Sequence, residues 1–500
     1  MLSTEPIRPN VLLITADQWS GSFLGCDGHP VLQTPTLDLL ARNGTRYTRA
    51  YTACPICIPA RRTLMTGTET RTHGDRVFNT VGTWPTEFTS LPQAFRDAGY
   101  QAHAAGKLHV YPPRDRIGFD DVQLAEEGRP YLGATDDYEM FLADRGYVGQ
   151  QFAGGMNNNN YMMRPWHLPE ECHSTNWLTQ TMCRTIKRRD PTRPSFWYLS
   201  YTAPHPPVTP LSIYLDYYRQ METPAALWSD WCADPESLPY ALRMGRNFWR
   251  MLPEDALREV RRAYYAQCTH IDHQLRVLLG TLREEGLLDD TIVMFTADHG
   301  EMLGDFGLYA KRLFYEGSAR IPMILMGAAN DRRVTPGTVD DRLVGLADVM
   351  PTLLELAGVP VPATVDGRSM VDGARRDHFY GDCLESNGAT RMLHDGRHKL
   401  IWYPAGNRTQ LFDLVNDPTE QRDVAADPDY IDIRGNLTRR LLSSLWGHDL
   451  EAGWANDDGL IGFDPGPYVV RPDRTWSGQR GLHFPSPPTI AQDKMIGFPQ

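Results

Sequence analysis

Apolar runs of strand length recur along the chain, and each is followed by polar or charged residues. The clearest are residues 10–16, 196–201 and 291–296, in which most positions are apolar. A largely apolar run of this length indicates a parallel strand that is covered on both faces. Ligands of open α/β sheets collect at the carboxyl ends of such strands, so the residues after each run are candidates for a site.

Helical patterns lie between these runs. Residues 34–44 predict a helix with Thr34 as its N-cap, Pro35 at its first position and Gly44 after its end. Residues 91–98 and 346–358 predict two more helices. In residues 254–286 apolar side chains recur at helical spacing, and we interpret His270 and His273 there as structural residues. Strands and helices together predict an α/β fold.

Two stretches show no clear periodicity. Residues 110–194 are rich in aromatic residues, Gly and Asn, with four consecutive asparagines at 157–160, and residues 210–251 are rich in Trp. We predict that both are insertions, the first loop-rich and lying over the mouth of a pocket.

The character of the chain changes past residue 377. Short strand-like runs alternate there with Gly, Asn and Asp turns, and after about residue 453 the chain is rich in Pro, Gly, Asp and Arg. These changes predict a large α/β domain at 1–376, a small antiparallel subdomain at 377–452 and an extended tail at 453–500. Trp476, Phe484 and Phe498 would be awkward on a free tail, so we expect the tail to wrap a neighbouring subunit of a homo-oligomer.

Composition narrows the function classes. The 500 residues carry a net charge of -12, which argues against nucleic acid and against an anionic membrane surface as partners. No apolar run reaches the length of a membrane span, and residues 1–6 show no secretory pattern. The eight cysteines are expected to be mostly reduced, so the predicted location is the cytoplasm.

The most informative stretch is residues 51–67. It contains a C-x-x-C at Cys54 and Cys57, which on its own allows a redox pair or half of a zinc site, but no second C-x-x-C exists in the chain. Cys57, Pro59, Arg61 and the residues up to Gly67 resemble the sulfatase signature of the alkaline phosphatase superfamily, with Ile58 bulkier than is usual there. The resemblance implies a large, mixed, mostly parallel sheet between helices, and oxidation of Cys57 to formylglycine by a formylglycine-generating enzyme.

A formylglycine hydrate suits the hydrolysis of a sulfate ester. Because the ester is anionic, the attacking hydroxyl must be activated by a cation and held in line. The second hydroxyl of the diol can later collapse to the aldehyde and expel sulfate. Arg61 lies one helical turn beyond Cys57, so we expect its guanidinium to hold the diol oxygens.

Two strand ends carry the candidate metal ligands. Asp17 and Gln18 follow the first apolar run, where Asp17 alone would more simply cap a turn. Asp298 and His299 follow the run at 291–296 and match the second ligand pair of the family. Asp17-Gln18 resembles the choline sulfatase and phosphonate monoester hydrolase branches. These four residues are expected to bind one divalent ion; Ca²⁺ is favoured because oxygen ligands dominate, and the imidazole leaves Mn²⁺ as the alternative.

The remaining site residues are assigned by resemblance, and their roles are hypotheses. Lys107 and His109 would lie on one face of a strand and meet one anion. Lys107, His205 and Lys311 would neutralise developing charge, and His205 or Lys311 would protonate the leaving oxygen. His109 would take the proton of the second hydroxyl. Asn79 and Gln18 would bind spectator oxygens.

Three functions remain open at this stage. The favoured one is a sulfuric ester hydrolase acting on a small sulfate ester, supported by Lys107 and His109. The alternative is a hydrolase of phosphonate monoesters or phosphodiesters on the same site, supported by Asp17-Gln18 and Asp298-His299. The third is a non-catalytic anion-binding or thiol protein in which Cys57 stays unmodified.

Overall fold

A computed structural model describes residues 8–80, 82–128, 134–156, 159–249, 251–469 and 484. Within these residues, an eight-stranded sheet with the order β4-β3-β5-β1-β6-β7-β2-β8 forms the centre of the molecule. All neighbouring strands run parallel except that β7 is antiparallel to β6 and β2. The strands are β1 (Asn10–Asp17), β2 (Thr45–Tyr51), β3 (Gln101–Gly106), β4 (Asp121–Leu124), β5 (Ser195–Pro204), β6 (Thr291–Ala297), β7 (Met323–Met326) and β8 (Thr338–Gly345).

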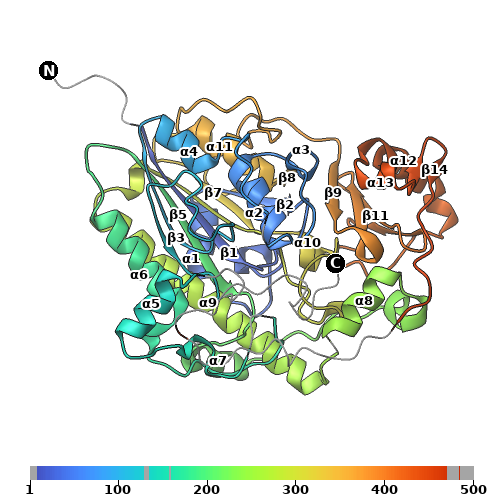
Figure 1. Cartoon of the computed structure of the whole chain (residues 1–500), viewed down its shortest axis with the longest axis horizontal. Coiled ribbons are helices and arrows are strands. Elements are labelled where there is room, and N and C mark those ends of the chain that lie inside the picture. Colours follow the sequence, from blue (N-terminus) through green and yellow to red (C-terminus); the bar gives the residue numbers. More distant parts are fainter. Residues whose placement is uncertain are drawn as a thin grey trace.

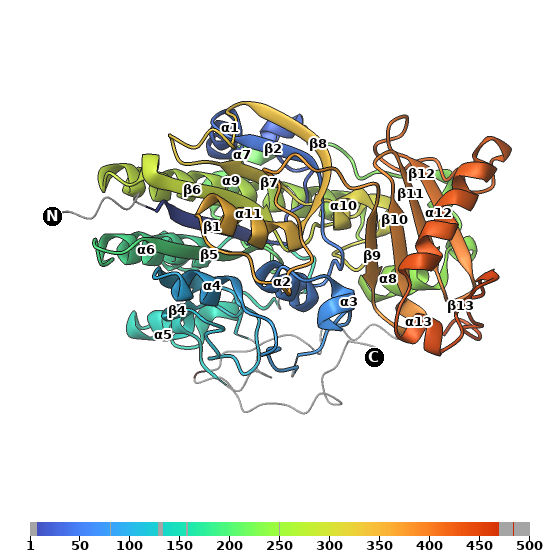
Figure 2. The ribbon, with the colours of Figure 1, turned by 90° about the horizontal axis from the view of Figure 1, so that it is seen from above.

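Helices cover both faces of this sheet. On one side α6 and α9 pack on β5, with α1 and α7 against α9, and on the other α2, α4 and α11 pack on one another (Figure 1; Figure 2). These two layers and the sheet between them confirm the predicted α/β fold. The helices of this part are α1 (Pro35–Arg42), α2 (Cys57–Thr66), α3 (Thr70–His73), α4 (Leu91–Asp97), α5 (Asp137–Asp144), α6 (Ser174–Lys187), α7 (Ser212–Arg219), α8 (Tyr240–Trp249), α9 (Glu254–Glu284), α10 (Glu316–Ala319) and α11 (Val349–Leu356).

The segment at 110–194 has more regular structure than its composition predicts. It supplies the edge strand β4 and the helices α5 and α6, and the segment at 210–251 supplies α7 and α8. Strand β4 is only four residues long, too short for a periodic pattern. Helix α6 buries Trp177, Leu178 and Ile186 on one face, but Thr175 and Thr179 are buried beside them and hide the apolar stripe in the sequence. The packing of α6 against α9 stabilises this helix despite its weak sequence pattern.

The C-terminal part of the described chain forms a second, four-stranded antiparallel sheet with the order β12-β11-β10-β9. One face packs on the part that contains the eight-stranded sheet, where the ring centroids of Tyr51 and Phe379 are 5.9 Å apart, and the other lies under α12 (Figure 2). The predicted antiparallel subdomain is therefore present. Its elements are β9 (Phe379–Cys383), β10 (Thr390–His394), β11 (His398–Tyr403), β12 (Arg408–Asp413), α12 (Ile431–Ser444), α13 (His448–Glu451), β13 (Ala455–Asn456) and β14 (Gly459–Leu460).

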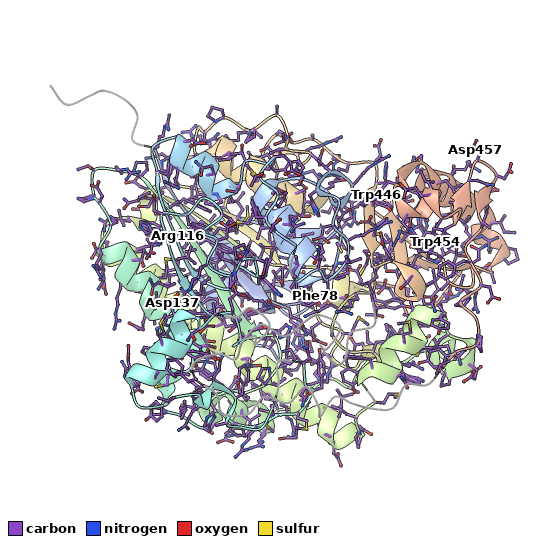
Figure 3. The ribbon with its side chains drawn as sticks, in the orientation of Figure 1. Phe78, Arg116, Asp137, Trp446, Trp454 and Asp457 are labelled. Atoms are coloured by element: carbon purple, nitrogen blue, oxygen red, sulfur yellow. The ribbon has the colours of Figure 1, made fainter. Side chains whose placement is uncertain are left out.

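Buried ion pairs join the two parts. Arg76, after α3, contacts Asp449 and Asp382 through Nη1 at 3.0 and 3.3 Å, and Arg391 pairs with the same Asp449. The guanidinium of Arg76 also lies 4.3 Å from the ring centroid of Trp446, which is labelled in Figure 3. These contacts fix the segment between α3 and α4 against the small sheet.

Most of the predicted tail lies outside the described residues, including Trp476 and Phe498. Its described part reaches α8, where the hydroxyl of Tyr468 donates to the carbonyl oxygen of Arg243 at 2.9 Å. The domain boundaries and the wrapping of a second subunit stay predictions. Among the described residues, no helix has both the length and the apolar character needed to cross a membrane.

Candidate functional site

Asp17 and Asp298 lie side by side because the strands that carry them are neighbours in register. Strands β1 and β6 are parallel neighbours with Ala16 opposite Ala297, so Asp17 and Asp298 leave the sheet at the same edge. Both carboxylates are fully buried. His299 follows Asp298, and its Nδ1 lies 3.1 Å from the carbonyl oxygen of Gly300. A carbonyl can only accept, so Nδ1 carries the proton and Nε2 is left as a possible ligand atom.

Cys57 is the first residue of α2 and lies at the same point. Its Sγ is 3.2 Å from His299 Nε2, and the ligand atoms of Asp17, Cys57, Asp298 and His299 all lie within 4.8 Å of one another. The sulfur is buried among charged groups, not in an apolar interior. Burial raises the pKa of the thiol, but Lys311 and Lys107 outweigh it and lower the pKa to about 7.

The two cysteines of the C-x-x-C have different hydrogen-bond partners. All eight cysteines are free thiols. The thiol of Cys54 donates to the carbonyl oxygen of Arg76 at 3.7 Å, whereas Cys57 Sγ contacts His299. The two cysteines therefore belong to different environments, and only Cys57 joins the carboxylates.

Arg61 connects the two aspartates. Its Nη2 donates to Asp17 Oδ2 at 3.0 Å and its Nε to Asp298 Oδ2 at 3.2 Å, while Nη1 donates to Ser200 Oγ and to the carbonyl oxygen of Lys107. The helical spacing places Arg61 on the side of Cys57, as expected. In addition to any contact with a diol, this guanidinium organises the carboxylates themselves.

Lys107 reaches the same group from the end of β3. Its Nζ lies 2.7 Å from Asp17 Oδ2 and 3.0 Å from Glu127 Oε1. Burial raises the pKa of Asp17, but the charges of Lys107 and Arg61 hold that pKa well below its usual value. Lys107 is thus part of the cluster that the structure brings together.

The expected strand geometry of Lys107 and His109 is wrong. Strand β3 ends at Gly106, which has φ 115° and lies so close to β5 that an added Cβ would be 1.8 Å from the carbonyl oxygen of Ser200. The chain turns there, and His109 adopts φ 59°. A carboxylate oxygen of Glu126 accepts from the backbone N–H groups of Leu108 and His109, both at 2.8 Å, and fixes the turn.

Asn79 and His109 lie beside the cluster. Both line a cavity next to Arg61, together with Trp84 and Tyr111. The ring of His109 is 5.6 Å from that of Phe78, which is labelled near the centre of Figure 3. Their positions allow contact with a substrate, and their roles stay predictions.

His205 and Lys311 form a pair. His205 Nδ1 lies 2.7 Å from the carbonyl oxygen of Pro206, so it carries the proton, and Nε2 accepts from Lys311 Nζ at 2.8 Å. Burial and the charge of Lys311 hold the pKa of His205 well below its usual value, so the imidazole is neutral. Lys311 Nζ also donates to Gln18 Oε1 at 2.6 Å. The amide oxygen of Gln18 therefore binds Lys311, and a role for Gln18 as metal ligand stays a prediction.

The donor set fits a divalent cation. Oδ2 of Asp17 accepts from Arg61 and Lys107, whereas Oδ1 is buried and has no hydrogen-bond partner within the described residues. A buried carboxylate oxygen without a partner is costly unless a cation binds it. Asp17, Asp298 and His299 offer the oxygen and nitrogen atoms that hard or intermediate divalent cations prefer.

Three buried residues of the site were not identified from the sequence. Glu127 lies between Lys107 Nζ and His205 Nδ1, at 3.0 and 3.5 Å. Glu301 and Tyr161 contact the side chain of Gln18. Glu301 follows Asp298 and His299 so closely that its position was a usable signal, but Glu127 and Tyr161 come from a segment without a pattern.

Comparison with known proteins agrees with this geometry. The sulfatase family model matches residues 9–359, and a model described as the C-terminal part of N-sulphoglucosamine sulphohydrolase matches residues 304–445. An arylsulfatase of Clostridium perfringens (strain 13 / Type A) is 32% identical over 475 residues, covering 91% of this chain and 98% of that protein. A choline-sulfatase of Rhizobium meliloti (strain 1021) is 31% identical over 443 residues, covering 84% of this chain and 83% of that protein.

A solved structure shows the same fold. The phosphonate monoester hydrolase of Agrobacterium radiobacter superposes with a TM-score of 0.75 at 24% identity, over 92% of this chain and all of that one. The family implies a metal ion and a formylglycine, and the site offers the residues for both. The chain therefore belongs to the sulfatase family, and it is a hydrolase of sulfuric ester bonds.

Proposed function

We propose that the protein hydrolyses a small sulfate ester with a formylglycine derived from Cys57, which a formylglycine-generating enzyme of the host produces. The observation that carries this proposal is the convergence of Asp17, Cys57, Asp298 and His299 within 4.8 Å. A hydrated formylglycine supplies an attacking hydroxyl and a second hydroxyl for release of sulfate. The family resemblance and the polar surroundings of Cys57 support this assignment.

We propose Ca²⁺ as the metal, with Mn²⁺ as the alternative. Asp17, Asp298 and His299 would hold it, and Gln18 remains a candidate ligand. When bound, the cation would polarise the ester and lower the pKa of the attacking hydroxyl. The predominance of carboxylate oxygens supports Ca²⁺.

The cations of the pocket bind and orient the anionic group. Lys107 is held by Asp17 and Glu127, and Lys311 by Gln18 and His205. Because His205 Nε2 accepts from Lys311, the histidine has no proton to give on that side. Lys311 is therefore the proposed proton donor to the leaving oxygen.

His109 and Asn79 complete the proposal. His109 would accept a proton from the second hydroxyl, and Asn79 would bind a spectator oxygen, whereas the amide nitrogen of Gln18 already donates to Tyr161 and Glu301. The cavity that Asn79 and His109 share beside Arg61 supports these roles. Replacing His109 by alanine should trap the enzyme after its first turnover, which a burst of product followed by no further release would show.

A second candidate activity is hydrolysis of phosphonate monoesters or phosphodiesters on the same site. The Asp17-Gln18 pair supports it, whereas Lys107 and His109 favour sulfate. Parallel assays with an aryl sulfate, a phosphonate monoester and a phosphodiester test the order of preference. Peptide mass spectrometry tests the nucleophile, since conversion of Cys57 removes roughly 18 Da.

We also propose a homo-oligomer formed through the C-terminal tail. Its support is the aromatic content of residues 453–500, whose side chains would be costly to expose to water. Sedimentation of the whole chain and of a chain ending at residue 469 tests it. If both chains form particles with the same number of subunits, the proposal is contradicted.

A further inference from the structure

The carboxylate of Glu301 is fully buried beside the site, and every contact made to it comes from a donor. Oε1 accepts from the backbone N–H groups of Leu303 at 2.6 Å and Ala310 at 2.8 Å. Oε2 accepts from the hydroxyl of Tyr161 at 2.6 Å and from the side-chain amide of Gln18. Four donors therefore surround this carboxylate, and none of the roles proposed above involves Glu301.

The first consequence concerns the orientation of Gln18. A glutamine amide has one donor end and one acceptor end. Its Nε2 donates to Glu301, so its Oε1 faces Lys311 Nζ, from which it accepts at 2.6 Å. The reversed orientation would put the NH₂ group against the ammonium group of Lys311. Glu301 therefore selects the orientation in which Gln18 can hold Lys311.

The second consequence concerns the loop before Lys311. Leu303, Phe306 and Ala310 have φ angles of 47°, 57° and 60°, a left-handed backbone that is strained for residues with a side chain. Oε1 of Glu301 binds the N–H groups at both ends of this loop, at Leu303 and Ala310. The same carboxylate thus fixes the backbone that carries Lys311 and the amide that holds its side chain.

We propose that Glu301 is a positioning residue that aims Lys311 at the leaving oxygen, an inference that rests on the proposed hydrolysis of a sulfate ester. As the hydroxyl oxygen of the formylglycine hydrate forms a bond to sulfur, the S–O bond to the alcohol breaks and its electron pair stays on the alcohol oxygen. That oxygen takes a proton from Lys311 Nζ, which becomes a neutral amine. Glu301 touches no reacting atom and acts through Gln18 and the loop.

The test compares two leaving groups. Glu301→Gln replaces one acceptor oxygen by an NH₂ group that faces donors, and Lys311 should lose its position. Phenyl sulfate has a poor leaving group that needs the proton, whereas 4-nitrophenyl sulfate has a good one that does not. We expect kcat for phenyl sulfate to fall by about 100-fold, the order of a general acid's contribution, and kcat for 4-nitrophenyl sulfate to fall by a few-fold only.

A matched control lies on the outside of the same loop. Asp305 Oδ1 accepts from the N–H of Leu227 at 2.9 Å and from Arg261 Nη1 at 3.1 Å, and it contacts neither Gln18 nor Lys311. Asp305→Asn should lower both rates by the same factor. Mass spectrometry of the residue at position 57 and circular dichroism confirm that the variants are converted and folded.

Equal losses on both substrates in Glu301→Gln would overturn the proposal. If that variant does not fold, Tyr161→Phe removes one donor from the carboxylate and should give the same selective loss with a smaller factor; equal losses there would also overturn it. A wild-type protein that hydrolyses neither sulfate would refute the proposed function instead, so the two failures are distinguishable.

Discussion

Replacing Lys107 by methionine tests the charge balance of the site, because it removes a buried ammonium group and keeps much of the side chain's length. Nζ of Lys107 is fully buried, 2.7 Å from Asp17 and 3.0 Å from Glu127. Breaking a buried ion pair by removing one partner costs about 3–5 kcal/mol. Arg61 still neutralises Asp17 at 3.0 Å, so we expect the lower end, about 3 kcal/mol, with the cost arising mainly at Glu127.

A second substitution separates stability from catalysis. In the double variant Lys107→Met with Glu127→Gln, the carboxylate that lost its counter-charge is also gone. We expect about half of the lost stability to return, roughly 1.5 kcal/mol, because the desolvated charge carried the cost. Activity should not return. Both variants lack the cation that meets the developing charge, so kcat should be lower by about 10²–10³-fold in each.

The assay uses the wild type, the two single variants and the double variant. Free energies of unfolding come from urea denaturation followed by tryptophan fluorescence, and rates from an aryl sulfate. The four values give the coupling energy between Lys107 and Glu127. If Glu127→Gln lowers stability further on top of Lys107→Met, the two side chains are not a stabilising ion pair and the reasoning fails.

Three more predictions follow from the site and its surroundings. Cys57→Ala should abolish turnover while circular dichroism stays that of the wild type, and residual turnover would contradict the nucleophile. Dialysis against a chelator should remove activity and Ca²⁺ should restore it; recovery with Mn²⁺ alone would assign the alternative metal. Burial, with the nearby Glu139 carboxylate, raises the pKa of Asp136 from 3.8 to about 7, so its contribution to stability is present below pH 3.8 and is lost as pH rises through 7. Asp136→Asn should therefore flatten the decline of Tm between pH 4 and 7 in scanning fluorimetry, and an unchanged slope would show that this carboxyl does not titrate there.

The positions of Asp17 and Asp298 could be predicted from the sequence because each lies at the carboxyl end of a largely apolar run of strand length. The structure adds that β1 and β6 are neighbours in register, which brings the two carboxylates together. Cys57 could be placed by its motif and Arg61 by helical spacing. These inferences use local patterns, which a single sequence carries.

The turn at Lys107 and the carboxylates around it could not be predicted in this way. Strand β3 ends at Gly106, which lies against the backbone of Ser200, a contact between residues far apart in sequence. Glu127 is bound by Lys107 and His205, which also come from distant segments. Buried charges of this kind are recognisable only when their partners are known.

The chain is acidic overall although its pocket is cationic. Buried carboxylates contact the cations of the pocket directly or through Gln18. Glu127 supports Lys107, and Glu301 supports Lys311 through Gln18. Each buried ammonium group is thereby stabilised before an anion arrives, and the donors stay in place when one binds. Glu127 and Tyr161 both come from the segment at 110–194. A change in that segment would therefore alter the position of Lys107 and Lys311 as well as the shape of the pocket.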